Sequence, residues 1–152
     1  MNNRGFLSLE VILGLLISSL ILGLILPGLG LFRDLEREYE FQTFVRNIEN
    51  VRNRAIFSNS DYGLELVDNK TYRLFNNRDL GPGGRPYNKS IKFKSDLEIY
   101  SSNYANNNSY NKIYFSSEGT ISRAGSIVLS SKAWKRKLYL RVNTGKIRIE
   151  EI

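Results

Sequence analysis

The feature that most constrains this chain is an apolar run over residues 6–32 that holds a single charged residue, Glu10. Eighteen of these 27 residues are Leu, Ile, Val or Phe. Each of them favours membrane insertion by about 0.3–0.6 kcal/mol, whereas a charge at the centre of the helix opposes it by about 2.5–3.5 kcal/mol. A helix of this length measures about 40 Å, which exceeds a hydrocarbon core of about 30 Å. The run therefore predicts a transmembrane helix.

The residues before the run distinguish it from a secretory signal peptide. A signal peptide has a longer basic leader and a small-residue cleavage site after its apolar stretch. Here only residues 1–5 precede the run. We therefore expect any cleavage to remove this short leader. As an alternative, Glu10 would lie near the end of a plain anchor helix, with its carboxylate among the lipid headgroups.

These N-terminal residues resemble the type IV pilins and pseudopilins. In that class a short basic leader ends in Gly, a prepilin peptidase cuts after it, and the new first residue, commonly Phe, is N-methylated. A helix-kinking proline is also common. The corresponding residues here are Gly5 at the leader end, Phe6 as the new N-terminus, Glu10 as the fifth mature residue, and Pro27.

The resemblance implies a structural subunit of a bacterial filament. It implies a single-pass protein of the inner membrane with its C-terminal domain outside the cytoplasm. The implied partners are other pilins or pseudopilins, the prepilin peptidase, the inner-membrane assembly platform and membrane lipid. Type IV pili and type II secretion pseudopili use the same subunit design, so the sequence leaves both machines open.

The resemblance also suggests a reason for the carboxylate of Glu10. In a bundle of apolar helices, the amino group of Phe6 would be buried without water. A neighbouring subunit's Glu10 can pair with that charge, which is far better in a low dielectric than two unpaired charges. We therefore expect Glu10 to set the register of subunit docking.

Residues 33–57 predict an amphipathic continuation of the helix. Apolar residues recur there at a spacing of three to four: Leu35, Phe41, Phe44, Ile48, Val51 and Ala55. We expect one near-continuous helix over residues 7–56, interrupted or bent around Pro27 because proline removes a helix hydrogen bond. Two helices joined by a loop at Pro27 are the alternative. Residues 58–61 favour caps and turns and should end the helix.

Residues 58–152 predict a globular antiparallel β domain. Short alternating runs are separated there by clusters of Gly, Asn and Asp. The expected strands are residues 62–67, 71–75, 90–94, 97–100, 112–116, 126–129, 137–143 and 146–150. The predicted fold class is thus α+β, with a long N-terminal helix packed on a small antiparallel β-sheet domain.

The composition excludes several chemistries. The chain has no Cys and no His, which removes thiol nucleophiles, Ser-His-Asp sites and imidazole or thiolate metal sites. The glycine-rich segment 76–88 lacks the Gly-Lys-Ser/Thr ending of a phosphate loop. The aspartates outside the helix are dispersed and form no calcium-loop motif: Asp61, Asp68, Asp79 and Asp96. We expect no enzymatic activity, no cofactor and no metal.

The C-terminal segment carries most of the net charge of +7. Residues 132–152 hold seven basic and two acidic residues, a net of +5. Apolar and polar residues alternate over residues 137–149, which predicts a hairpin with its turn at 144–145 and one apolar face. The other face carries basic residues and one aromatic: Lys137, Tyr139, Arg141, Lys146 and Arg148.

The C-terminal half resembles the GspH/FimT group of minor pseudopilins and pilins. The resemblance rests on residues 115–120, 127–129 and 145–149. It implies a long N-terminal helix packed on two small antiparallel sheets. Some FimT-like members are thought to bind DNA through a Gly-Arg-x-Arg turn. The counterparts here would be Gly145, Lys146 and Arg148, and Lys146 departs from the pattern because it lacks the bidentate fork of Arg.

The resemblance leaves two functions open. The first is a minor structural subunit of a pilus or pseudopilus. The second is a DNA-binding competence pilin, in which Lys137 and Arg141 would add contacts to phosphate. A plain edge hairpin is a further alternative, since basic residues also prevent edge-to-edge aggregation of sheets.

Overall fold

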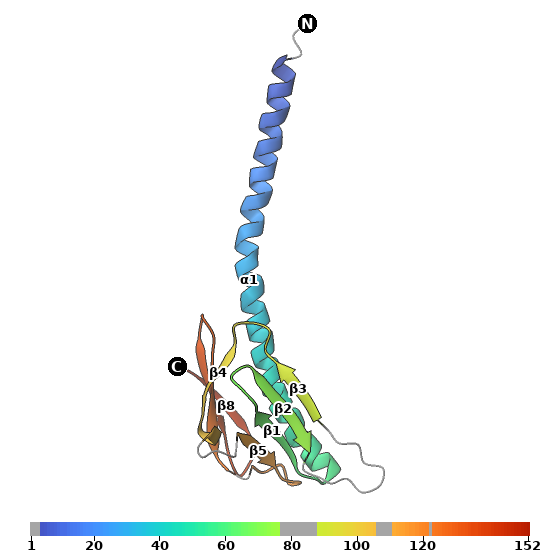
Figure 1. Ribbon diagram of the computed structural model, residues 1–152, viewed down its shortest axis with the longest axis vertical. Coiled ribbons are helices and arrows are strands. Elements are labelled where there is room, and N and C mark those ends of the chain that lie inside the picture. Colours follow the sequence, from blue (N-terminus) through green and yellow to red (C-terminus); the bar gives the residue numbers. More distant parts are fainter. Residues whose placement is uncertain (1–3, 77–87, 106–110, 122) are drawn as a thin grey trace. The chain divides into compact units, whose positions relative to one another are not determined.

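The computed structural model describes residues 4–76, 88–105, 111–121 and 123–152, and the side chains of these except 4–9, 24–29 and 105 (Figure 1). The chain divides into two compact units, Met1–Glu36 and Arg37–Ile152. The boundary between the units falls within the single long helix. The predicted α+β class, with a long N-terminal helix and two small antiparallel sheets, is confirmed.

Helix α1 spans Arg4–Ser58 without a break. The expected near-continuous helix is therefore confirmed, whereas the interruption at Pro27 and the alternative of two helices joined by a loop are wrong. Proline removes one of the many backbone hydrogen bonds of this 55-residue helix, and the leucines nearby favour helix although Gly28 and Gly30 do not. Within the described part of the chain, no helix has an apolar stretch long enough to cross a membrane.

The strands form two antiparallel sheets of four (Figure 1). Sheet A has the order β3-β2-β1-β5, and sheet B has the order β4-β6-β7-β8. All eight strands were expected, with ends that differ by at most three residues. Their bounds are β1 Tyr62–Leu66, β2 Thr71–Asn76, β3 Asn88–Lys92, β4 Glu98–Ser102, β5 Lys112–Phe115, β6 Gly125–Ser130, β7 Lys135–Leu140 and β8 Ile147–Glu151.

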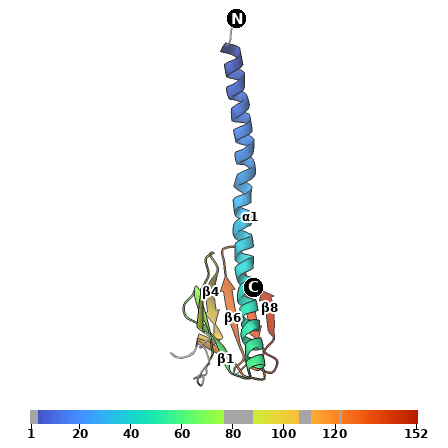
Figure 2. The same ribbon diagram turned by 90° about the vertical axis from the view of Figure 1, so that its right-hand side faces the viewer.

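The core of the second unit forms where α1 packs on both sheets (Figures 1 and 2). The ring of Phe44, on the helix, packs edge-on against the ring of Tyr72 in sheet A, with 4.8 Å between the ring centroids. Phe41 meets Trp134, just before β7 of sheet B, at 5.2 Å. Aromatic pairs of this geometry add about 0.5–1.5 kcal/mol beyond their burial. One face of the helix thus holds both sheets.

The predicted apolar stripe of α1 is correct except at its start. Its five members from Phe41 to Ala55 are at most 1 % exposed, whereas Leu35 is 66 % exposed. Leu35 lies in the first unit, before the stretch of helix that the sheets cover. Val45 is also buried and was not in the predicted stripe.

Two ion pairs, here called the helix clamp, fasten the first turn of the helix in the second unit. Arg37 Nε lies 2.5 Å from Asp96 Oδ1, in the β3–β4 connection. Glu38 Oε2 lies 2.6 Å from Arg136 Nη1 of β7. Asp96 also accepts the backbone N–H of Lys132 at 3.1 Å. The clamp therefore joins α1 to segments that are distant in the sequence.

Glu40 adds a third contact one turn along. Its carboxylate accepts the backbone N–H groups of Lys94 at 2.6 Å and Ser95 at 3.2 Å, and the Ser95 hydroxyl at 2.6 Å. A buried or half-buried turn must have its backbone donors paired. The helix thus supplies the hydrogen-bond acceptor that the turn after β3 lacks.

We expect the clamp to make the stability of this unit sensitive to acid. Burial raises the pKa values of Glu38 and Asp96, but hydrogen bonds from neighbours, including Arg136 and Arg37, outweigh it and lower both pKa values. A carboxyl whose pKa is lower in the folded than in the unfolded chain stabilises the fold above the unfolded pKa. That contribution is lost as pH falls through the folded pKa.

Urea unfolding of residues 34–152 should therefore show a lower midpoint at pH 3 than at pH 7. The Glu38→Gln, Asp96→Asn double variant should have a lower midpoint at pH 7 and a smaller decrease on acidification. Glu49→Gln, which removes an exposed carboxylate from the same helix, is the matched control. An unchanged pH response in the double variant would contradict the role of the clamp.

Candidate functional site

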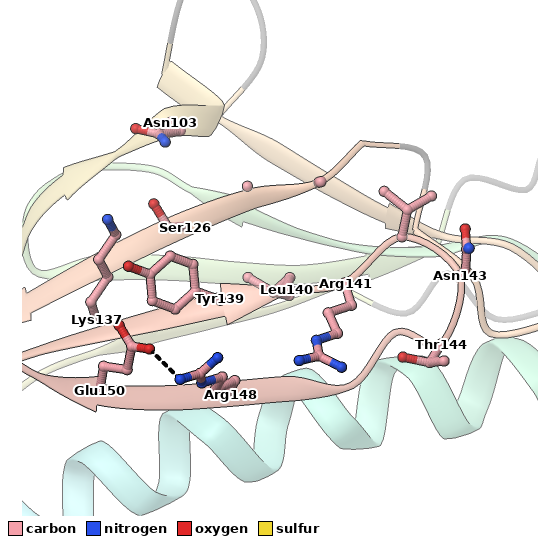
Figure 3. Close-up of a pocket in the computed structure, with 13 residues that line it drawn as sticks. Asn103, Ser126, Lys137, Tyr139, Leu140, Arg141, Asn143, Thr144, Arg148 and Glu150 are labelled. Carbon is pink, nitrogen blue, oxygen red and sulfur yellow. Dashed lines mark ion pairs between the residues drawn. The ribbon is translucent and has the colours of Figure 1, made fainter.

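A groove of about 740 Å³ lies on sheet B, beside the loop that joins β7 to β8 (Figure 3). Strand β6 and the short helix η1 (Asn103–Ala105) form its other side. The groove is lined by Asn103, Ala124, Gly125, Ser126, Lys137, Tyr139, Leu140, Arg141, Val142, Asn143, Thr144, Arg148 and Glu150. It is therefore built from three strands, the β7–β8 loop and η1.

Three of the predicted basic residues meet in this groove: Lys137, Arg141 and Arg148. The Lys137 ammonium lies over the ring of Tyr139, 4.6 Å from its centroid. Tyr139 stands directly opposite Arg148 in the β7–β8 register. Four of the five residues predicted for the basic face thus line one groove, and Lys146 does not (Figure 3).

Glu150 adds a carboxylate that the prediction did not include. Its Oε1 lies 2.8 Å from Arg148 Nη2, and the residue stands opposite Lys137 in the register. Alternation along β8 could have found Glu150, because residues two apart share a strand face. Asn103 and Ser126 could not have been found this way, since they come from other elements.

The β6 side of the groove is lined by small residues, Ala124, Gly125 and Ser126. A Cβ atom on Gly125 would lie 2.5 Å from the ring of Tyr104, so the close packing of that ring excludes a side chain there. Tyr104 donates its hydroxyl to the carbonyl of Arg123 at 3.2 Å, and burial raises its pKa to about 12. The phenol therefore stays neutral at physiological pH and can keep its hydrogen bond to the segment that leads into β6.

The β7–β8 loop is longer than the predicted two-residue turn. β7 ends at Leu140 and β8 begins at Ile147, so Arg141 and Lys146 lie in the loop and not in strands. The N–H of Arg141 donates to the carbonyl of Lys146 at 3.2 Å, and the N–H of Gly145 donates to the carbonyl of Arg141 at 2.9 Å. These bonds close a compact loop that the strand alternation alone does not reveal.

Gly145 holds this loop against the rest of the domain. Its φ of +59° lies in the left-handed region, and a Cβ there would lie 2.4 Å from the Gly119 carbonyl oxygen. The same oxygen accepts a hydrogen bond from Arg52 Nε of α1 at 3.1 Å. Gly145 and Lys146 are not among the lining residues of the groove. The geometry gives Gly145 a structural role in positioning the groove.

The predicted N-terminal residues lie in α1. Glu10 is exposed in this single chain. Gly5, Phe6 and Pro27 have helical backbone, and they belong to the stretches whose side chains the structure does not describe. Among the residues that are described, no three acidic side chains gather in a way that could hold a metal ion. The expected pairing of Glu10 with an amino terminus involves a second subunit and stays a prediction.

The fold and the groove can be compared with known proteins. The family model of the type II transport protein GspH matches residues 40–146. This chain belongs to the GspH family. The matched segment covers most of the second unit and ends at Lys146, before Arg148 and Glu150 of β8. Among curated proteins, no sequence matches the chain.

Solved structures of GspH-like subunits share the fold. The minor pseudopilin EpsH from the type 2 secretion system of Vibrio cholerae has a TM-score of 0.58 at 15% identity, over 76% of this chain and 97% of its own. The type IV minor pilin FimU of Pseudomonas aeruginosa has a TM-score of 0.59 at 13% identity, over 77% and 90%. Escherichia coli GspH has a TM-score of 0.55 at 13% identity, over 78% of this chain and 88% of its own.

Membership of the GspH family identifies the chain as a pilin-like structural subunit and not an enzyme. The structures that it resembles come from both a secretion system and a type IV pilus. At these identities the likeness shows the fold alone. The choice between the two machines therefore stays open.

We expect Gly145→Ala to destabilise the domain by about 1–3 kcal/mol, because a non-glycine residue is strained in the left-handed region and its Cβ would meet the Gly119 carbonyl. Urea unfolding of residues 34–152 measures this. Asn143→Ala, in the same loop and at an exposed position, is the control and should change the midpoint little. Equal midpoints for the two variants would disprove the structural role of Gly145.

Proposed function

We propose that this chain is a minor pilin or pseudopilin, a structural subunit that assembles into a type IV pilus or a type II secretion pseudopilus. The observation that carries the proposal is the GspH family match over residues 40–146, together with the sequence from Gly5 to Glu10 upstream of it. In this proposal a prepilin peptidase cuts between Gly5 and Phe6, and Phe6 becomes N-methylated.

Residues 6–32 would hold the subunit in the inner membrane before assembly, with the C-terminal domain outside the cytoplasm. Their apolar composition supports this role. Within this segment, every large apolar side chain from Val11 to Leu22 is at least 50 % exposed in the single chain. Such a continuous apolar surface needs a cover. Lipid supplies it in the membrane, and neighbouring subunit helices supply it in the filament.

Glu10 would then pair with the amino group of Phe6 on a neighbouring subunit. A carboxylate surrounded by apolar helices is costly unless a positive charge meets it. Assembly into the filament would bring that charge next to Glu10, and the assembly platform would drive the assembly. Pro27 would lie in the filament core as part of the same helix.

N-terminal mass spectrometry of the cellular protein tests this function. We expect a methylated Phe6 start, and an intact Met1 in a host that has the peptidase would refute the class. Glu10→Ala should keep the Phe6 start and membrane insertion but reduce incorporation into filaments, because the buried amino group loses its partner. Ser8→Ala is a control in the same turn. Normal incorporation of Glu10→Ala would disprove the pairing.

A second candidate function is binding of DNA, and the groove favours it. Lys137, Arg141 and Arg148 line one concave surface together with the aromatic ring of Tyr139. Cations neutralise phosphates, and an aromatic ring gives bases a surface on which to stack. In this role the subunit would be a competence pilin. Lys146 would contribute from the exposed rim of the same loop.

Electrophoretic shifts of DNA by residues 34–152 at two salt concentrations test this candidate. Lys137→Ala with Arg141→Ala should weaken binding and reduce the salt slope by about two. Each lost cation removes one phosphate contact, and binding then releases one counterion fewer. Lys89→Ala with Lys92→Ala removes the same charge from β3 of sheet A and is the matched control. Equal loss from both pairs would indicate general charge attraction and not a groove site.

A further inference from the structure

The groove contains an internal counterion for one of its own cations. Glu150 is the one carboxylate among the described lining residues, and its Oε1 lies 2.8 Å from Arg148 Nη2 (Figure 3). Arg148 has no other ion-pair partner within the described residues, and Lys137 and Arg141 have none there. The three cations are therefore not equivalent: two are available to a ligand, and one is already engaged.

The position of Glu150 extends its effect beyond Arg148. It stands directly opposite Lys137 in the β7–β8 register, and the Arg148 and Glu150 side chains are 62 % and 40 % exposed. A ligand phosphate that approaches Arg148 must displace this carboxylate and also lie next to its negative charge. An exposed pair of this kind is weak, so a phosphate chain can displace it.

We propose that Glu150 sets the affinity of the groove for nucleic acid by holding Arg148 in competition with the phosphates. This inference rests on the second proposed function, DNA binding in the groove. The phosphates first meet Lys137 and Arg141, and Arg148 joins them only when it leaves Glu150. Glu150 is a specificity-determining residue, because it weakens binding of any polyanion that offers too few phosphates to displace it.

The neighbouring residue provides a matched control. Glu151 carries the same charge one position along β8 and is 74 % exposed in its side chain. It lies on the other face of the strand, where it pairs with Arg136 at 3.0 Å, and it does not line the groove. Glu150→Gln and Glu151→Gln therefore change the net charge equally, but only Glu150→Gln removes a charge from the groove and releases Arg148.

The experiment uses the full-length protein in detergent and a fluorescently labelled 20-nucleotide oligo-dT, with anisotropy at 50 and 200 mM salt. Glu150→Gln should lower Kd by roughly threefold to tenfold at 50 mM salt and steepen the salt slope by about 0.7, the value for one added phosphate contact on a single strand. Glu151→Gln should stay within about twofold of the parent protein. In the Arg148→Ala background, Glu150→Gln should lower Kd by less than it does in the parent protein, because the part of its effect that runs through Arg148 is absent.

The outcomes separate the inference from the function on which it rests. If the parent protein binds with a salt dependence that Lys137→Ala with Arg141→Ala reduces, but Glu150→Gln binds no tighter, the inference alone is overturned. An equal gain from Glu150→Gln and Glu151→Gln overturns it too, since that is a general charge effect. If no variant binds the oligonucleotide, both the inference and nucleic-acid binding fail. A thermal unfolding curve for each variant confirms that it is folded.

Discussion

The globular part of this protein depends on one helix face that covers two sheets. Both four-stranded sheets bury apolar side chains against one apolar surface of α1. The stripe from Phe41 to Ala55 provides that surface, and the rings of Tyr72 and Trp134 pack on it from the two sides. The groove lies on sheet B, so its shape also depends on this packing.

Much of the fold follows from local patterns. The eight strands were expected to within three residues of their observed ends, and the helical stripe recurs at the expected spacing, so both could be predicted. The exceptions have physical causes. Leu35 fits the period but lies outside the unit that the sheets cover. Pro27 does not break the helix, because it removes only one backbone hydrogen bond from a helix of 55 residues.

The helix clamp and the groove could not be predicted, because they join residues far apart in the chain. Arg37 and Asp96 are 59 positions apart, and Glu38 and Arg136 are 98 apart. No periodicity links such partners. The basic residues of the hairpin were found from alternation, but their enclosure depends on Asn103 and Ser126. The size of the loop depends on the left-handed backbone of Gly145, which strand alternation conceals.

The attachment of the β7–β8 loop to α1 has a consequence for how such subunits diverge. Gly145 packs closely against the Gly119 carbonyl and Arg52, whereas Asn143 and Thr144 line the groove at exposed positions. A mutation at Asn143 alters the surface that a ligand meets and leaves these supporting contacts in place. Thr144 differs, because its Oγ1 accepts the backbone N–H of Lys146 at 3.3 Å. Related subunits can thus acquire new ligand preferences by drift at the position of Asn143, while selection for folding keeps the support of the loop unchanged.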